Sequence, residues 1–309
     1  MAVTSARMSS TAEKTAEQKE LDADEKFFRD CFCRGYWGAV CKDPRSRRPP
    51  VVTISCIAAC VAVWYANEGP PRDNRGWWYR SGPDEAWYLS LGAMFSHVSE
   101  DHLWGNTVIA LMVMTFYELT EGYLKTIAIV WGAGTLGFAL NALVRPSHVI
   151  VRGFSGCVYG LIAAQLSVLK LNWAEMPCRW TRVLILLLAF GSDSAVYFVM
   201  RRTGVSYGTH LFGALAGISI TGVTARNVNM RRFEQAFSWA GLCGYIVMEL
   251  VAFAGEQTAA ASLSLAVVPI LLYFHVANVR RACAKRRAGE GCCGRALVLE
   301  QGGARETNV

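Results

Sequence analysis

The sequence predicts an all-α fold, a polytopic bundle of transmembrane helices. Hydrophobic residues make up 53% of the 309 residues and charged residues only 18%, and the mean hydropathy is +0.25. The apolar residues come in long runs instead of alternating with polar ones. A helix crosses the hydrocarbon core of a bilayer with about 20 mostly apolar residues, and several runs approach this length. The composition therefore argues against an ordinary soluble domain.

The apolar runs define the candidate transmembrane helices. In chain order they are Val51–Ala66, His102–Leu119, Thr126–Val144, Phe154–Leu171, Val183–Met200, Thr209–Val223, Gln235–Gly255 and Ala259–Val279. Residues 1–48 are polar, mixed in charge sign and without an apolar core, so we expect a cytosolic extension that is partly disordered. Residues 281–309 are expected to form a basic cytosolic tail.

Basic residues predict the orientation in the membrane. With the N-terminus in the cytosol, the loops richest in Lys and Arg also face the cytosol. These loops carry Lys170, Arg179, Arg182, Arg226, Arg231, Arg232 and the Arg280–Arg287 cluster. Cytosolic loops of membrane proteins have this excess of positive charge. We therefore interpret the net charge of +7 as a topology signal, and no module of aromatic and basic residues indicates a nucleic-acid partner.

The 11 cysteines do not predict a disulfide framework. In this orientation most of them lie on the reducing, cytosolic side, where disulfides rarely persist. The stretch "DCFCRGYWGAVC" does not have the spacing of a recognised zinc site. Free thiols are therefore expected.

Ser155 is the first residue that indicates chemistry. It follows a loop and opens an apolar helix within Gly153-Phe154-Ser155-Gly156, so its backbone N–H is among those left unpaired at a helix N-terminus. Both glycines allow another group to approach closely, and Tyr159 lies one turn deeper on the same face. Serines in membrane helices also commonly bond to a carbonyl one turn earlier. The pattern alone therefore leaves a structural serine open.

A nucleophilic serine needs a base, and the chain has only 5 histidines. His275 is expected at the cytosolic end of the last helix, and His148 lies in a loop that offers nothing to hold it. His210 begins a helix on the same non-cytosolic side as Ser155. Small residues on the two helices allow their backbones to pack closely: Gly156, Gly160, Gly213 and Gly217. His210 is therefore the candidate base.

Two further histidines and an asparagine lie in "SHVSEDHLWGN". His102 and Asn106 are one turn apart on one face of a helix start, and His97 precedes them. Acyl transfer requires donors directed at the developing oxyanion, and an imidazole and a carboxamide beside the Ser155 N–H meet this need. A zinc site is the competing interpretation, but no Asp or Glu completes it at helical spacing, and Asn is a poor zinc ligand.

Together these motifs resemble those of the rhomboid intramembrane serine proteases. That family has His-x4-His-x3-Asn on its second helix, Gly-x-Ser-Gly on its fourth and His-x-x-Gly-x3-Gly on its sixth. The matching residues are His97, His102, Asn106, Gly153, Ser155, Gly156, His210, Gly213 and Gly217, and Glu118 with Gly122 match a Glu-x3-Gly at the end of the second helix. The resemblance covers roughly Val51 to Thr224.

The resemblance implies a role for each of these residues. Ser155 would be the nucleophile and His210 its general base, with Tyr159 stacked on the imidazole. His102 and Asn106 would join the Ser155 N–H in an oxyanion hole, and His97 would be structural. The implied reaction is hydrolysis of a peptide bond within or beside a transmembrane helix, with no metal or cofactor. The implied partners are transmembrane protein substrates and membrane lipid.

The resemblance also implies a domain organisation. A six-helix core is expected at residues 49–226, followed by one or two extra transmembrane segments at residues 227–280. Rhomboids of the eukaryotic secretory pathway often add a helix at the C-terminus. This predicts the secretory pathway or plasma membrane, with the active site toward the lumenal or extracellular side. In the first loop, Trp87-Tyr88 stands where active rhomboids usually carry a Trp-Arg pair.

Two other functions are weighed against the protease. Non-catalytic rhomboid-like proteins bind membrane clients for trafficking or degradation, but they lack the serine or the histidine, and this chain retains both. A small transporter would require an internal repeat and polar residues near the midplane of several helices. No such repeat is present, and the polar residues cluster toward one side.

Overall fold

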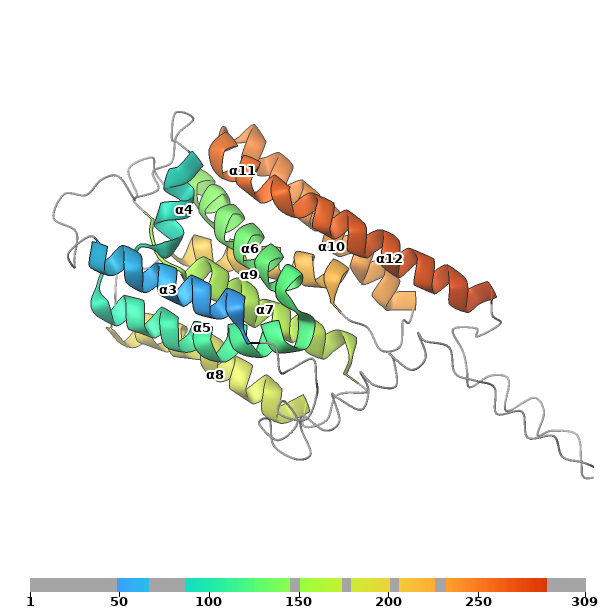
Figure 1. Cartoon of the computed structure of the whole chain (residues 1–309), viewed down its shortest axis with the longest axis horizontal. Helices are drawn as coiled ribbons and strands as arrows, with labels where there is room; N and C mark the ends of the chain where they lie inside the picture. The colour runs from blue at the N-terminus through green and yellow to red at the C-terminus, as the bar shows by residue number, and fades with distance from the viewer. Residues whose placement is uncertain are drawn as a thin grey trace, which may run out of the picture.

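A computed structural model describes residues 49–66, 87–144, 151–173, 179–200, 206–225 and 232–287. The extension predicted at residues 1–48 and the tail beyond residue 287 lie outside these ranges. The helices are α3 (Val51–Ala66), α4 (Trp87–Phe95), α5 (Glu100–Glu121), α6 (Tyr123–Val144), α7 (Ser155–Leu171), α8 (Arg179–Met200), α9 (Tyr207–Thr224), α10 (Arg232–Ala254), α11 (Thr258–Ser264) and α12 (Val268–Arg287). Their long members run roughly side by side in one bundle (Figure 1).

α9 lies at the centre of this bundle. It packs against α6, α7, α10 and α12. Small residues occupy much of its buried surface, which allows neighbouring backbones to come close. α6 is also buried along most of its length. By contrast, α3 packs mainly against α5, and α8 packs mainly against α7, so these two helices lie toward the outside.

The outer surface of the bundle is apolar. α6, residues Phe233–Ala254 and residues Ala260–Cys283 are long and apolar enough to cross a membrane, and α3 and α7 are apolar but shorter. Exposed apolar side chains include Val108, Leu111, Met112, Leu184, Leu187, Leu188, Val247 and Leu250. A surface of this kind is stable where lipid replaces water as the solvent. The predicted all-α, polytopic bundle is thus confirmed.

Both ends of α5 follow from local sequence. The Ser99 side chain accepts a hydrogen bond from the backbone N–H of His102 at 3.3 Å, and two acidic residues in the first turn complement the helix dipole. At the other end Gly122 has a φ of 95°, which ends α5 and turns the chain into α6. The cap therefore sets the position of His102 and of Asn106 one turn later.

The last apolar run, expected at Ala259–Val279, is interrupted. It forms α11, a 3-10 turn at Leu265–Val267 and then α12. Pro269 explains the interruption, because proline has no N–H to donate to the carbonyl of Leu265 and its ring crowds that carbonyl. The chain tightens instead, and the N–H of Val268 bonds to Leu265.

Glu118 joins α5 to the N-terminus of α3. Its Oε1 accepts from the backbone N–H of Val52 at 2.8 Å. Its Oε2 accepts from the N–H of Thr53 at 2.8 Å and from the Thr53 hydroxyl at 2.7 Å. A helix start leaves N–H groups unpaired and has a positive dipole end, so a carboxylate satisfies both. Glu118 thus fixes the outer helix α3 to the core.

We expect Glu118→Gln to lower the free energy of unfolding by about 1–3 kcal/mol, because an amide NH2 replaces an acceptor oxygen opposite buried donors. The measurement is unfolding in detergent micelles. Glu100→Gln is the matched control on the same helix, since this exposed carboxyl accepts from Trp104 at the surface and should contribute less than about 1 kcal/mol. Equal losses in the two variants would contradict the anchoring role of Glu118.

Candidate active site

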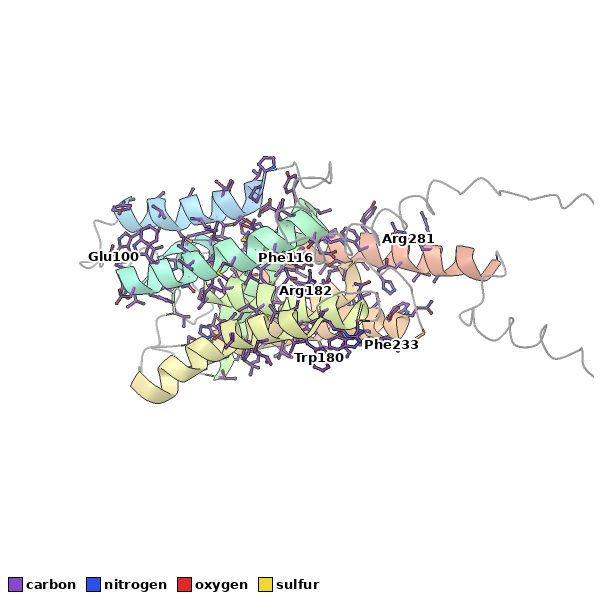
Figure 2. All side chains as sticks on the ribbon, turned by 90° about the horizontal axis from the view of Figure 1, so that it is seen from below. Glu100, Phe116, Trp180, Arg182, Phe233 and Arg281 are labelled. Carbon is purple, nitrogen blue, oxygen red and sulfur yellow. The ribbon has the colours of Figure 1, made fainter. Side chains whose placement is uncertain are left out.

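The predicted site residues gather at the end of the bundle where α5, α7 and α9 begin. In Figure 2, Glu100 at the start of α5 marks this end, and Arg281 of α12 lies at the opposite end. Because successive long helices run in opposite directions, residues from distant parts of the chain meet here.

Ser155 is the first residue of α7 and is half-buried. Phe154, which precedes it, supplies no side-chain cap, and the first N–H groups of a helix have no intrahelical acceptor. The N–H of Gly153 donates to the carbonyl of Ala93 in α4 at 2.9 Å, and the ring of Phe154 stacks on Phe95 with centroids 5.8 Å apart. Ser155 is therefore presented by a turn that α4 holds.

Gly153 brings this turn against His102. A Cβ at Gly153 would lie 2.7 Å from Cε1 and 3.2 Å from Nε2 of the His102 ring. The φ of Gly153 is 130°, a conformation that favours glycine. Both the lack of room for a Cβ and the backbone conformation therefore require glycine here. The His102 imidazole lies beside the residues that lead into Ser155.

His210 stacks on Tyr159 of α7. The ring centroids are 4.2 Å apart and the planes differ by 11°, which is the stack that the sequence resemblance implies. Tyr159 lies one turn below Ser155, so the stack holds the imidazole against the face of α7 that carries the serine. Phe190 of α8 makes an edge contact with the same tyrosine ring at 5.1 Å.

Glycines set the distance between α7 and α9. A Cβ on Gly213 would meet the backbone oxygen of Gly156, and a Cβ on Gly217 would meet that of Gly160. In the other direction, a Cβ on Gly160 would lie 3.1 Å from the backbone oxygen of Gly213. Backbone atoms cannot move aside as a flexible side chain can. The two helices therefore touch directly below Ser155 and His210.

Asn106 adds a donor to this end of the bundle. It lies one turn after His102 on α5 and is 9% exposed. Its Nδ2 is buried and has no hydrogen-bond partner within the described ranges. A buried donor without an acceptor costs free energy, so this amide is available to a bound acceptor group.

His97 supports His102. Its ring meets the His102 ring edge-on with centroids 5.2 Å apart, and its Nδ1 lies 3.2 Å from the carbonyl of Phe95. Burial, with a further contribution from nearby His102, lowers the pKa of His97 to about 3. The ring is therefore neutral at physiological pH, and Nδ1 is the nitrogen placed to donate to that carbonyl.

A metal centre would need more ligands than this pair supplies. In the part of the chain that the structure describes, His, Cys, Asp and Glu side chains form no group of three or more able to hold a metal ion. Structural zinc sites use four protein ligands and catalytic ones three.

Asn141 of α6 is a neighbour of the site that lies outside the sequence motifs. It is 0% exposed, and neither side-chain amide atom has a hydrogen-bond partner among the described residues. A Cβ on Gly208, at the start of α9, would collide with its Oδ1. The sequence could have indicated Asn141, because it is a polar residue inside the apolar run "GTLGFALNALV".

The neutral ring of His97 predicts a pH dependence of stability. The folded ring resists protonation down to about pH 3, whereas the unfolded ring takes up a proton below its ordinary pKa of 6.5. Between these values the unfolded state holds more protons, so stability is present above pH 6.5 and is lost as the pH falls. His97→Gln should flatten this dependence by up to about 1.4 kcal/mol per pH unit. The measurement is the free energy of unfolding in micelles between pH 7 and 5. Equal slopes against pH in the parent and the variant would contradict a neutral, buried His97.

The glycine contact predicts a second stability effect. Gly213→Ala and Gly217→Ala should each lower the free energy of unfolding by about 1–3 kcal/mol, because the new methyl group forces the helices apart. Gly105→Ala is the control, since a Cβ there meets nothing within 4 Å and should stabilise α5 by about 0.5–1 kcal/mol. Thermal unfolding compares the three. Stabilisation of all of them would show that the close contact does not exist.

Comparison with known proteins identifies the fold around this site. The family model for the Rhomboid domain matches residues 83–227, a range that contains the site from His97 to Gly217. Three curated proteins are similar to part of this chain. Rhomboid-related protein 1 of Caenorhabditis elegans is 32% identical over 166 residues, 52% of this chain and 46% of that protein. Rhomboid-related protein 3 of Homo sapiens is 29% identical over 172 residues, 52% of this chain and 42% of that protein. The chloroplastic Rhomboid-like protein 11 of Arabidopsis thaliana is 26% identical over 148 residues, 43% of this chain and 51% of that protein.

The chain spans about half the length of the curated relatives it matches. Their similarity covers the helices that carry the candidate site, and the apolar helices described above agree with it. The chain is therefore an integral membrane protein that carries a Rhomboid domain at residues 83–227.

Proposed function

We propose that this protein is an intramembrane serine endopeptidase that cleaves transmembrane segments of single-pass membrane proteins. The observation that carries the proposal is the stack of His210 on Tyr159, one turn below Ser155 on the same helix. The direct backbone contact between the helices of Ser155 and His210 supports the proposal, because nucleophilic catalysis by serine needs a base close to the hydroxyl.

The first half of the reaction acylates Ser155. His210 removes the hydroxyl proton as the serine oxygen attacks the carbonyl carbon of the scissile peptide bond. The C–N bond then breaks, the proton on His210 passes to the departing amine, and the acyl group remains on Ser155 as an ester. The stacked tyrosine keeps the imidazole in the orientation that both proton transfers need.

Three donors would stabilise the tetrahedral intermediate. They are the backbone N–H of Ser155, the His102 ring beside Gly153, and the buried Nδ2 of Asn106. The positive end of the α7 dipole points the same way. Preorganised donors of this kind stabilise the oxyanion without reorganising during the reaction, and each is worth about 100- to 1000-fold in rate.

The second half of the reaction uses water. A water molecule loses a proton to His210 and attacks the ester, which releases the acyl part as a carboxylic acid and restores the serine hydroxyl. Ser155 is half-buried at the end of the bundle where the helix starts converge, and we propose that water enters from this end while the substrate helix lies along the apolar flank.

The same geometry supports an orientation with the N-terminus in the cytosol. Arg182 and Phe233 lie toward the end opposite Glu100 (Figure 2). There Arg182 lies over Phe116 at 4.7 Å and Lys170 over Phe237 at 4.9 Å. Basic residues are in excess on the cytosolic side of membrane proteins. We therefore propose that the active site opens to the lumenal or extracellular side, in the secretory pathway or the plasma membrane.

The test is cleavage of a single-pass reporter in proteoliposomes, together with labelling of the serine by a fluorophosphonate probe. Ser155→Ala and His210→Ala should each lower the cleavage rate by at least about 1000-fold, and Ser155→Ala should abolish labelling. Ser167→Ala is the control on the same helix, because that hydroxyl donates to the Ala163 carbonyl and should be dispensable.

A different outcome would favour the second function. If the parent protein neither labels nor cleaves, yet retains single-pass helices through purification, the protease proposal fails and client binding takes its place. Cleavage that persists in Ser155→Ala would instead point to a contaminating protease.

A further inference from the structure

Helix α4 controls the position of the turn before Ser155. The carbonyl of Ala93 accepts from the N–H of Gly153 at 2.9 Å, and Phe95 stacks on Phe154. Met94 is fully buried, and a Cβ on Gly134 of α6 would lie 2.9 Å from its sulfur. α4 therefore touches both residues that lead into the serine, and any shift of α4 moves the start of α7.

The residues that support α4 come partly from the far end of the sequence. α4 packs against α3 and α6, and also against α11, which lies beside it at one end of the bundle (Figure 1). α11 begins at residue 258, beyond the matched Rhomboid domain that ends at residue 227. The extra C-terminal helices thus reach the segment that holds the candidate nucleophile.

α11 is itself held firmly. Its Ala260 and Ala261 are both 0% exposed, and such small side chains allow close packing with α6 and α4. The Tyr245 hydroxyl of α10 donates to the carbonyl of Ser264 at 2.9 Å. The turn before α11 is anchored as well, because a Cβ on Gly255 would collide with Leu143 of α6.

We propose that α11 is a positioning element for the active site, which holds α4 so that the Gly153–Ser155 turn presents the nucleophile and its N–H correctly. The mechanistic consequence rests on the proposed protease function. α11 supports α4 from beyond the matched Rhomboid domain. A displacement of about 1 Å in a catalytic group lowers rates by about 100-fold, so a loosened α4 lowers turnover without altering the dyad.

The first test needs no enzymatic activity. In the full-length protein, Ala261→Val should speed hydrogen exchange at the Gly153 amide at least tenfold, because the added methyl groups push α11 away from its neighbours and free α4. Ala266→Val is the matched control, since Ala266 is exposed just after α11 and the exchange rate should not change. Equal exchange in both variants and the parent would overturn the proposal.

The second test separates positioning from folding. Per labelled Ser155, Ala261→Val should lower kcat at least tenfold with KM within about twofold, and Ala261→Ser, which adds a single oxygen, should retain most of kcat. Activity lost only in proportion to the amount of folded enzyme would overturn the proposal.

A milder variant covers the case in which Ala261→Val does not fold. Tyr245→Phe removes the bond to Ser264 but keeps the ring, and should raise Gly153 exchange about threefold. Tyr273→Phe, at an exposed ring of α12, is its control. If the variants show faster Gly153 exchange but the parent protein shows no labelling or cleavage, the protease function is refuted. The role of α11 in holding α4 then still stands.

Discussion

The direct contact between the backbones of α7 and α9 is the constraint on which the rest of the structure depends. Gly213 and Gly217 have no room for a Cβ against Gly156 and Gly160. With the two backbones in contact, the imidazole of His210 on α9 stacks on Tyr159 of α7. The contact also places α9 where α6, α10 and α12 can pack around it, so one pair of small-residue faces sets both the site and the centre of the bundle.

A second constraint is the environment around this contact. The proposed peptide hydrolysis needs water, ionisable groups and donors, whereas a membrane helix is stable when its polar groups are satisfied internally. The chain resolves the conflict by concentrating polar groups at the helix starts. His97, His102, Ser155 and His210 all lie in or near a first turn, where unpaired N–H groups favour negative charge. The flanks of the same helices remain apolar.

Bonds between distant segments then hold the outer helices to this centre. Glu118 binds the start of α3 across a separation of 65 or 66 residues. On the other side, the C-terminal helices pack on α9 and α6 through glycines, since a Cβ on Gly241 would lie 2.6 Å from the backbone oxygen of Ser219. The core is therefore supported by elements from both ends of the described chain.

The sequence by itself determined the helical bundle, the approximate helix limits and the identity of the residues at the candidate site. These features depend on local properties: run length, helix caps, and motif spacing that places Ser155 and Tyr159, or His102 and Asn106, on one helix face. Only the tertiary structure decided which helices touch. Asn141 beside Gly208, Phe190 against Tyr159, and α11 against α4 are contacts between distant segments. Helix periodicity specifies which side of a helix a residue occupies, but the partner on that side is chosen by the packing of the whole bundle, and no local pattern encodes it.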